Sequence, residues 1–578
     1  MYSLNAEQKT IGELFKKTNV QFLVPDYQRN YSWTIEHCRT LWNDIYSFAF
    51  PNGNSESFDE KEKYFLGTII TFHNEDGKDE IIDGQQRLIT FLILLRAFYT
   101  ASEDMKETNE DAKELISEIE QCIWNKEPRR PLNKDRVKVE LEVASDDDKR
   151  QFKKIIKNGI VSDSDKSKYS ENYGWFQKQI DDLKIKTPNL FLDMPWRILR
   201  NCVILPIIAD SQDTALRIFT TLNDRGMPLS DSDIFKAKFY KFFSTSEVAR
   251  KNFSQRWKSL EETCKKIFHP RRGSALDDLF TRYMYYVVAS KKFPNTTFKG
   301  LRKFYEQGNY ELLHNENTFE ELILLANFWK SVYERDENLF SERVIRLLYI
   351  LEYSPYVMWY YSVSVYFLVK RNKQNQLEEV SFYKFLNKIT AFILAHSIDK
   401  PGVDAIRLPM LYEMVNLVNN QPIEFKNYKF RAPLLEMKIE EFSFSNSKLI
   451  TRSMLAWWTF KDAAQELPPI DTRLEIEHIY PKNRQNNLIA ENSVELLGNK
   501  TLLEKRINIR ASDYRFEDKR KYYLGYTKGK QEIKGTMIRE LRDIAKFKND
   551  FTEDDIFERN EKIFSAFMEF LAQNNLLR

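Results

Sequence analysis

Residues 473–483 read RLEIEHIYPKN, and a short loop later residues 497–508 read LGNKTLLEKRIN. His478 can accept a proton near neutral pH and stands directly after the carboxylate of Glu477. That carboxylate and the amide oxygen of Asn508 are hard ligands that suit Mg²⁺ with several waters retained. Phosphodiester hydrolysis needs both a base and a divalent cation. The two stretches therefore predict a metal-assisted hydrolytic site near the end of the chain.

A strand is expected to end at this site. Strict alternation of side chains along a strand would put Glu477 and His478 on opposite faces, away from one another. Pro481, three residues after His478, cannot continue a central ladder of hydrogen bonds. We therefore expect the strand to end or to bulge at Glu477 and His478.

The pattern acidic-x-acidic-His-Ile-x-Pro, then Gly-Asn, and then Asn nine residues later resembles the ββα-metal finger of HNH nucleases. The resemblance implies that His478 is the general base and that Glu477 and Asn508 hold Mg²⁺ or Mn²⁺. Asn499 would tie the loop and orient the base. Glu475 would assist the two metal ligands.

The segment that follows this motif is basic. The chain as a whole carries a net charge of only +3, so affinity for phosphate must come from local patches. Between Lys500 and Lys548 bases outnumber acids, which makes a patch large enough for phosphate contacts. The same resemblance implies that Lys519 or Arg520 holds substrate phosphate.

Three further segments join polar clusters to apolar flanks: VPDYQRNYSW at 24–33, IIDGQQRLIT at 81–90 and LNDRGMPLSDSDIFKAK at 222–238. In the second, a β-branched run, Gly84 and an apolar run follow one another, which predicts a strand, a turn and a buried helix. Such a glycine turn directs backbone N–H groups toward an anion. These segments indicate an anion site in the first part of the chain.

Arg29 and Arg87 are the side chains best suited to phosphate in these segments, because a guanidinium donates two parallel hydrogen bonds. The structural alternative is that these arginines pair with Asp26, Asp83 or Asp233 inside the domain. For either arginine taken alone this alternative is the better explanation. The three segments taken together favour a binding site.

The combination YQRxYxW, DGQQRLxT and LNxRGxxLxxxDxxKA is similar to the N-terminal domain of the GmrSD family, whose fold is similar to that of ParB and sulfiredoxin. EHIYP with LGNKTLL resembles the C-terminal nuclease domain of the same family. The resemblance implies a single-chain type IV restriction system for phage defence. Its N-terminal domain would bind and hydrolyse a nucleoside triphosphate and sense modified DNA, and its C-terminal domain would cut or nick.

The resemblance also assigns a nucleotide-binding or DNA-sensing loop, in which Gln85 and Gln86 can orient a water or a base edge. The residues assigned to this loop are Tyr27, Gln28, Arg29, Asp83, Gly84, Gln85, Gln86, Arg87, Asn223 and Arg225. The sequence has no Walker A motif, GxxxxGK followed by Ser or Thr. Triphosphate hydrolysis would therefore have to use the DGQQR segment.

The expected fold class is α+β and predominantly α-helical. The apolar and aromatic contents of 42% and 14%, with only 16 Gly and 18 Pro, are typical of a compact protein rich in helices. We expect a ParB/sulfiredoxin-like N-terminal domain at residues 1–245 and a helical middle domain at 246–440. A ββα-metal (HNH) domain would occupy residues 441–578.

The four cysteines lie far apart without a CxxC pair, which argues against a disulfide framework and against a cysteine-rich zinc site. The first residues, MYSLNAEQKTIGELF, lack the apolar core of a signal peptide. No apolar run reaches the roughly 18 residues that a membrane span needs. We expect a cytoplasmic protein without a membrane segment.

The leading hypothesis is an endonuclease that cleaves modified phage DNA with Mg²⁺ at His478 and is regulated by nucleotide at Arg87. A second is a sensor of phosphorothioate-modified DNA that hydrolyses a nucleoside triphosphate and nicks. A third is a nucleotide-switched, nucleic-acid-binding regulator with a non-catalytic finger, and a fourth is a nuclease directed at RNA. The sequence leaves open whether the protein forms a homodimer.

Overall fold

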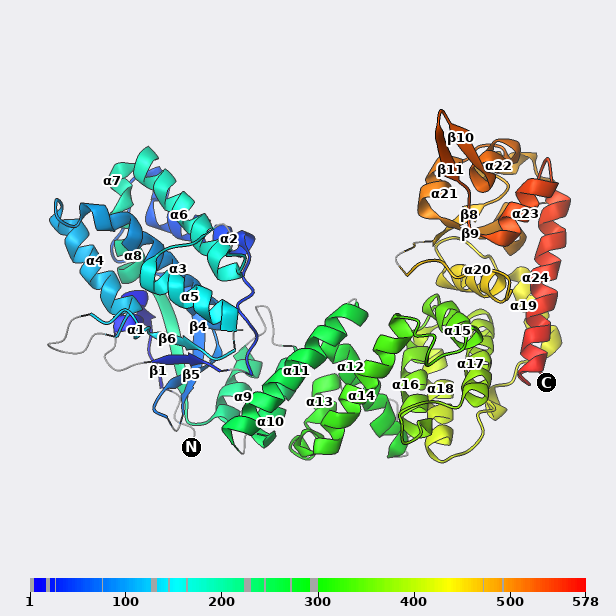
Figure 1. Cartoon of the computed structure of the whole chain (residues 1–578), viewed down its shortest axis with the longest axis horizontal. Coiled ribbons are helices and arrows are strands. Elements are labelled where there is room, and N and C mark those ends of the chain that lie inside the picture. Colours follow the sequence, from blue (N-terminus) through cyan, green and yellow to red (C-terminus); the bar gives the residue numbers. More distant parts are fainter. Residues whose placement is uncertain are drawn as a thin grey trace. The chain divides into compact units, whose positions relative to one another are not determined.

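The computed structural model divides the chain into two compact units, Met1–Gln255 and Arg256–Arg578 (Figure 1). Helices make up 62% of the structure and accompany a mixed sheet, which confirms a predominantly helical α+β protein. The described residues are 5–16, 21–25, 27–74, 76–125, 132–143, 146–162, 165–222, 230–243, 246–270, 273–291, 300–470, 472, 474–490 and 493–578.

The first unit is built on a mixed sheet with the strand order β1-β7-β4-β5-β3-β6, and β2 also pairs with β7. The central strands β4 and β7 run parallel, whereas β4 and β5 run antiparallel. The strands are β1 (Asn5–Ala6), β2 (Lys9–Thr10), β3 (Phe22–Val24), β4 (Tyr64–His73), β5 (Asp79–Asp83), β6 (Val139–Leu141) and β7 (Cys202–Ala209).

Helices cover both faces of this sheet. Ile69 of β4 joins a large core on one face, and its neighbour Ile70 joins a smaller core on the other face, as strand alternation requires. The larger core includes α1 (Ile11–Lys16), α2 (Ile35–Ala49), α3 (Gln85–Ser102), α4 (Glu110–Ile123), α5 (Asp146–Asn158), α6 (Lys168–Lys186), α7 (Pro188–Phe191) and α8 (Asp193–Asn201). The smaller core includes α9 (Gln212–Leu222) and α10 (Asp231–Phe243).

The predicted succession of strand, turn and helix around Gly84 is confirmed. Strand β5 ends at Asp83, Gly84 has the positive φ of 94° that favours glycine, and α3 begins at Gln85. Helix α3 is buried along almost its whole length, because LITFLILLRAFY is apolar on every side. The turn therefore lies between a central strand and a fixed core helix.

The next part of the chain is helical, as its apolar spacing predicts. Helix α11 (Glu247–Ile267) spans the unit boundary in the sequence. After it come α12 (Ala275–Ser290), α13 (Leu301–Tyr305), α14 (Glu316–Tyr333), α15 (Glu342–Glu352), α16 (Met358–Lys370), α17 (Glu379–Asp399), α18 (Val403–Val418), α19 (Ala432–Glu441) and α20 (Leu449–Phe460). The aromatic runs lie inside: Trp329 and Trp359, for example, pack edge to face with their ring centroids 5.7 Å apart.

The last part of the second unit alternates short strands and helices (Figure 1). Its elements are β8 (Leu474–His478), β9 (Lys500–Glu504), α21 (Lys505–Ala511), α22 (Phe516–Leu524), β10 (Gly525–Lys528), β11 (Gln531–Lys534), α23 (Arg539–Phe547) and α24 (Glu553–Gln573). Strands β8 and β9 form one antiparallel pair, and β10 and β11 form another.

All four cysteines, Cys38, Cys122, Cys202 and Cys264, are buried as free thiols. Each belongs to an apolar core and so acts as a small hydrophobic side chain. Within the described residues, none of the helices has the length and apolar character that crossing a membrane would demand.

Candidate functional site

The segment around His478 folds as strand, strand and helix. Strand β8 pairs antiparallel with β9, with His478 opposite Lys500 and Glu477 opposite Thr501. Helix α21 begins directly after β9 and packs against both strands. Strand β8 ends at His478, three residues before Pro481, as expected, but it is regular through Glu477 and His478, so the ending does not bring these two side chains to one face.

Because β8 is regular to its end, Glu475 and Glu477 share one face and His478 points to the other. On the first face, Nδ2 of Asn508 donates to Oε2 of Glu475 at 3.3 Å. The ammonium of Lys519 donates to Oε1 of Glu477 at 2.7 Å, and the hydroxyl of Tyr523 donates to the same oxygen at 2.6 Å. Asn508 and Glu477 thus have different partners.

His478 faces a cluster of charges on the other side of the strand. Its Nε2 lies 3.8 Å from Oε1 of Glu495, and Lys482 is 2.7 Å from the same oxygen. The fully buried ammonium of Lys500 donates to Glu495 and to the carbonyl oxygen of Phe444. Burial opposes ionisation of Glu495, but the two lysines outweigh it and hold the pKa of that carboxyl at about 2.

These surroundings keep His478 neutral. Burial lowers the pKa of His478 to about 4, and the charge of Lys500 acts in the same direction against the weaker pull of Glu495. Nε2 is buried and has no hydrogen-bond partner within the described part of the chain. A neutral imidazole is the protonation state from which a general base can accept a proton.

Asn499 fixes the loop between the two strands. Its Oδ1 accepts a hydrogen bond from the backbone N–H of Tyr480 at 2.6 Å. Its Nδ2 donates to the carbonyl oxygens of Tyr480 and Val494, each at 3.0 Å. The side chain is fully buried, so Asn499 holds the backbone that directly follows His478.

The donor set does not fit a divalent cation as it is arranged. A hard cation needs several oxygens with open lone pairs, and Oε1 of Glu477 already accepts from Lys519 and Tyr523 inside the core. Burial raises the pKa of Glu477, and the ammonium of Lys519 opposes that rise. Across the described part of the chain, no group of three or more His, Cys, Asp and Glu side chains is placed to hold a metal.

The two residues expected at substrate phosphate are engaged elsewhere in the structure. Lys519 is only 1% exposed and faces Glu477. Nε of Arg520 donates to the carbonyl oxygen of Ala545 at 2.7 Å, and Nη1 donates to Asn549 at 3.1 Å. Both side chains therefore bond within the unit.

The sequence does carry a signal that Lys519 is buried. The buried residues of α22 recur at the spacing of one helix face, and they are Phe516, Lys519 and Tyr523. Glu495 is a further site residue that the sequence motifs do not mark. The signal for it is weaker: Lys500 stands on a strand among apolar neighbours, and a buried ammonium needs an acidic partner.

In the first unit, glutamine side chains join two of the three N-terminal segments. Nε2 of Gln85 donates to Oε1 of Gln28 at 3.1 Å, and Nε2 of Gln28 donates to the carbonyl oxygen of Ile82 at 3.2 Å. Gln86 donates to the carbonyl oxygen of Asn30 at 3.1 Å and accepts from the backbone of Ser32. These amides stabilise the loop itself.

Two arginines and two carboxylates lie together beside this network. Burial raises the pKa of Asp83, while the charges of Arg87 and Arg29 oppose the rise. Burial likewise raises the pKa of Asp233, and Arg29 again opposes. Nη1 of Arg87 donates to the carbonyl oxygen of Thr68 at 2.9 Å. Nε of Arg29 is buried and has no hydrogen-bond partner among the residues that the structure describes.

The third segment reaches the same place in its described part. Nζ of Lys236 lies 3.4 Å from the carbonyl oxygen of Gln28, and the hydroxyl of Tyr27 donates to Glu80 nearby on β5. Asn223 and Arg225 lie outside the described residues. The structure thus brings the described parts of all three segments to one end of the sheet.

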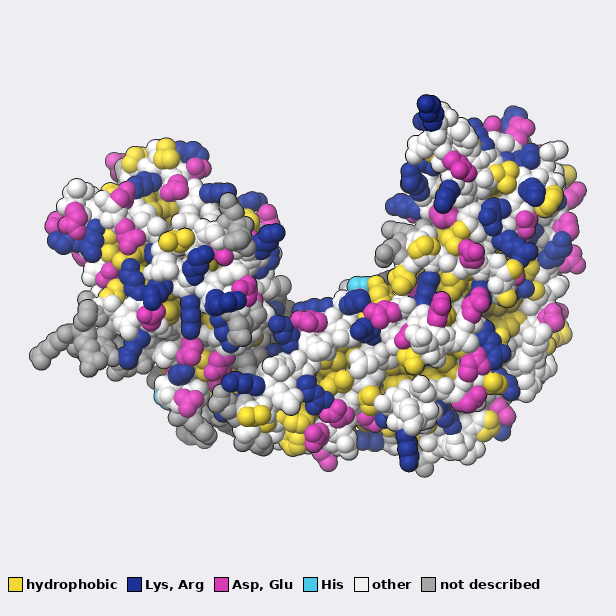
Figure 2. All heavy atoms as spheres, in the orientation of Figure 1, with side chains coloured by type: hydrophobic (Ala, Val, Ile, Leu, Met, Phe, Trp, Pro, Cys, Tyr) yellow, Lys and Arg dark blue, Asp and Glu magenta, His cyan; other side chains and the backbone are white. Residues whose placement is uncertain are grey.

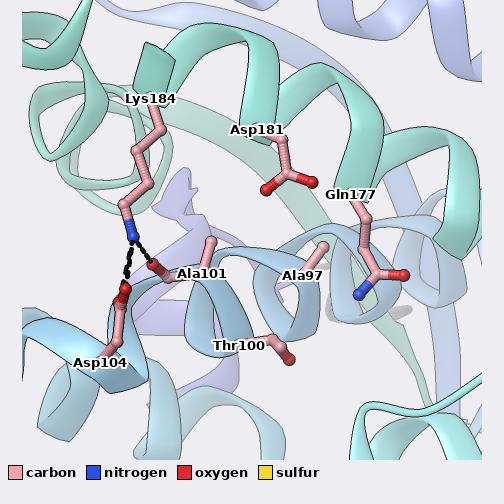
Figure 3. A pocket seen from close by; sticks show the side chains of 7 residues that line it. All are labelled: Ala97, Thr100, Ala101, Asp104, Gln177, Asp181 and Lys184. Atoms are coloured by element: carbon pink, nitrogen blue, oxygen red, sulfur yellow. Dashed lines mark hydrogen bonds and ion pairs between the residues drawn. The ribbon is translucent and has the colours of Figure 1, made fainter.

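A separate hollow of about 210 Å³ lies between α3 and α6 (Figure 3). It is lined by Ala97, Thr100, Ala101, Asp104, Gln177, Asp181 and Lys184. Lys184 is already bonded to the carbonyl oxygen of Ala101 and to Asp104. The hollow is smaller than the roughly 300 Å³ at which small-molecule sites begin, so it adds no binding site.

Comparison with known proteins identifies the family to which the chain belongs. Residues 11–240 match the N-terminal domain of GmrSD restriction endonucleases, and residues 425–566 match the C-terminal domain of the same enzymes. Together the two matches span more than half of the chain. The chain belongs to the GmrSD restriction endonuclease family.

One curated relative is an uncharacterized protein of Methanocaldococcus jannaschii, 23% identical to this chain over 274 residues. The similarity covers 42% of this chain and 43% of the relative. The chain thus spans less than half the length of the curated protein that it matches.

Proposed function

We propose that this protein is an endonuclease that cleaves or nicks modified phage DNA at His478, under the control of a nucleoside triphosphate bound in the first unit. The observation that carries the proposal is the neutral imidazole of His478. Its Nε2 has no hydrogen-bond partner among the described residues, and the loop behind it is fixed by Asn499. Membership of a family of restriction endonucleases supports DNA as the substrate.

In the proposed reaction, Nε2 of His478 takes a proton from the water that attacks the phosphorus atom. The P–O bond to the leaving oxygen breaks as the new P–O bond forms, and the leaving oxygen takes a proton from solvent. Because the imidazole is neutral near pH 7, no prior deprotonation is needed. Glu495 would stabilise the imidazolium that forms, since its carboxylate lies 3.8 Å from Nε2. Lys482 is exposed beside the same carboxylate and is the cation that we expect to meet the phosphate.

Mg²⁺ or Mn²⁺ is the cofactor that we propose from the resemblance to HNH nucleases. The carboxylate of Glu477 does not fit a cation while Lys519 neutralises it, so no step of the reaction is assigned to the metal. That ion pair also favours a second candidate function, a nucleotide-switched binding protein whose finger does not catalyse. The two candidates differ in whether phosphodiester bonds are broken.

The cleavage test compares wild type, His478→Ala and the control His269→Ala, in which an exposed histidine of the same unit is changed. Each protein is incubated with plasmid, modified phage DNA and matched RNA, in Mg²⁺, Mn²⁺ or EDTA, with and without each nucleoside triphosphate. We expect DNA cleavage by wild type and His269→Ala only, and only with metal. Equal products from His478→Ala would refute the role of His478, and nucleotide-dependent DNA binding without cleavage would support the second candidate.

For the nucleotide, we propose that Arg29 and Arg87 bind the phosphates beside Asp83. In support of this, Nε of Arg29 is buried without a partner among the described residues, and the charges of Arg87 and Arg29 both act to lower the pKa of Asp83. Isothermal titration of Arg29→Gln with each nucleoside triphosphate should show at least tenfold weaker binding than wild type. Arg39→Gln is the control, because Arg39 pairs with Glu36 on the exposed side of α2. Equal affinity of Arg29→Gln and wild type would remove Arg29 from the site.

A further inference from the structure

Strands β10 and β11 form a short hairpin that follows directly on α22. Lys528 pairs across the ribbon with Gln531, Lys530 lies in the turn beside Gly529, and Lys534 ends the second strand. Figure 2 shows Lys and Arg side chains at the tip of this hairpin. We call Lys528, Lys530 and Lys534 the hairpin lysines.

The hairpin lysines are exposed, and none of them forms an ion pair with any residue that the structure describes. The hairpin itself carries one acid, Glu532, which stands opposite Thr527 in the ribbon. Three unpaired positive charges on a two-stranded ribbon repel one another and add nothing to the stability of the fold. Such an arrangement is suited to a negatively charged partner.

Tyrosines support the ribbon from beneath. The ring of Tyr526 on β10 packs edge to face with Tyr522 of α22 at 5.6 Å, and Tyr522 stacks against Tyr514 at 6.4 Å. Lys521 lies 5.0 Å above the ring of Tyr522, and Tyr514 is 51% exposed. The same surface thus adds an aromatic row and a fourth cation beside the hairpin lysines.

The base of the hairpin is fixed to the body of the candidate nuclease site. A Cβ on Gly535 would lie 2.2 Å from the carbonyl oxygen of Tyr523, so the chain passes closely over the end of α22. The backbone of Thr536 donates to that same carbonyl oxygen, and its hydroxyl donates to Glu504 at the end of β9. The ribbon therefore projects from α22 and β9, the elements that flank β8.

We propose that this hairpin enters a groove of duplex DNA and that the hairpin lysines bind its phosphates. A two-stranded antiparallel ribbon has the width that the roughly 12 Å major groove admits. Lys528 and Lys530 at its tip and Lys534 near its base then meet the backbones that border the groove. This inference rests on the proposed function, because it names the surface by which the nuclease holds its substrate.

The test measures equilibrium binding of a fluorescent DNA duplex by anisotropy in EDTA, so that cleavage does not interfere. The test variant carries Lys528→Ala, Lys530→Ala and Lys534→Ala in the full chain. The control variant carries Lys303→Ala, Lys373→Ala and Lys384→Ala, three exposed lysines of the helical part of the same unit. A third variant replaces the hairpin lysines by arginine and keeps the charge.

We expect the alanine variant to bind roughly tenfold more weakly at 50 mM salt, with the control and arginine variants close to wild type. The slope of log affinity against log salt should flatten by about 0.9 for each phosphate that the variant no longer neutralises. Equal affinity and equal slope for wild type and the alanine variant would overturn the inference. Hairpin-dependent binding confined to single-stranded DNA would overturn the assignment to duplex.

Cleavage by the same preparations separates this inference from the proposed function. Cleavage that needs His478 but not the hairpin lysines would refute the proposed DNA-binding surface and support the proposed nuclease. Duplex binding that needs the hairpin lysines, without cleavage by any of the proteins, would refute the proposed nuclease and support the proposed DNA-binding surface.

Discussion

The ammonium group of Lys519 lies 2.7 Å from Oε1 of Glu477, and both side chains are buried. The attraction offsets the cost of removing two charges from water only while both partners are present. The Lys519→Met variant should therefore lose roughly 3 to 5 kcal/mol of stability at pH 7, measured as a shift of the urea midpoint. The loss should shrink at lower pH, because a protonated Glu477 needs no counter-ion.

The control for this experiment is Lys562→Met, since Lys562 forms an exposed pair with Glu558 on α24. Exposed pairs contribute at most about 1 kcal/mol, so the control should shift little. Equal shifts in the two variants would show that the Lys519–Glu477 pair contributes no more to stability than an exposed pair.

Replacing Asn499 by alanine should disorder the loop that follows His478. Three backbone groups, one N–H and two carbonyl oxygens, would lose their hydrogen bonds to the Asn499 side chain. Each such group costs about 1 to 3 kcal/mol when it is left unpaired, so stability and cleavage should both fall. Asn487→Ala, at an exposed position in the same connection, should leave both unchanged. Full activity of Asn499→Ala would exclude the positioning role.

Gly84 should tolerate no larger residue. Its φ is 94°, and a Cβ there would lie 2.7 Å from Cγ1 of Ile69. Gly84→Ala therefore combines backbone strain with a clash in the core and should cost more than about 1 kcal/mol. Gly77 has a similar φ of 75° but open space around it, so Gly77→Ala reports the strain alone. A thermal melt in which Gly84→Ala is no less stable than Gly77→Ala would contradict the close approach to Ile69.

His396 should make the helical part sensitive to acid. Burial lowers its pKa to about 4, and Asp399 and Lys400 have smaller and opposite effects. An unfolded chain protonates this histidine near its usual pKa of about 6.5, so its contribution is complete above that pH. As the pH falls toward 4, roughly 3 kcal/mol of stability should be lost.

The His396→Leu variant tests this expectation, because it removes the titrating group and keeps an apolar side chain. Urea midpoints between pH 7 and pH 4.5 should fall less steeply for His396→Leu than for wild type. His269→Leu changes an exposed histidine and should follow wild type. Parallel curves for all three proteins would show that the acid sensitivity comes from groups other than His396.

Local patterns in the sequence are enough to predict several elements. The strand, Gly84 turn and α3 follow from a β-branched run, a glycine and an apolar run, and the end of β8 follows from Pro481. The helical part between α12 and α18 follows from its apolar spacing. In each case residues close in sequence determine the outcome.

Long-range partners are not predictable in this way. Lys519 is 42 residues from Glu477, and no local spacing links them. A lysine on a basic helix therefore suggests a phosphate ligand, whereas packing of Phe516 and Tyr523 turns that face of α22 inward. The pairing of β7 with β4 likewise joins Cys202 to Tyr64 across a stretch that holds most of the helices of the first unit.

The buried thiols bear on how the protein can be labelled. Burial raises the pKa of Cys38, Cys122, Cys202 and Cys264 to about 12, so almost no thiolate is present at neutral pH. Maleimide reagents need an accessible thiolate, and the native chain should leave them unreacted. A cysteine introduced at the hairpin tip, as in Lys530→Cys, would then take up a single fluorophore without removal of any native cysteine, and its emission would respond directly to the approach of DNA.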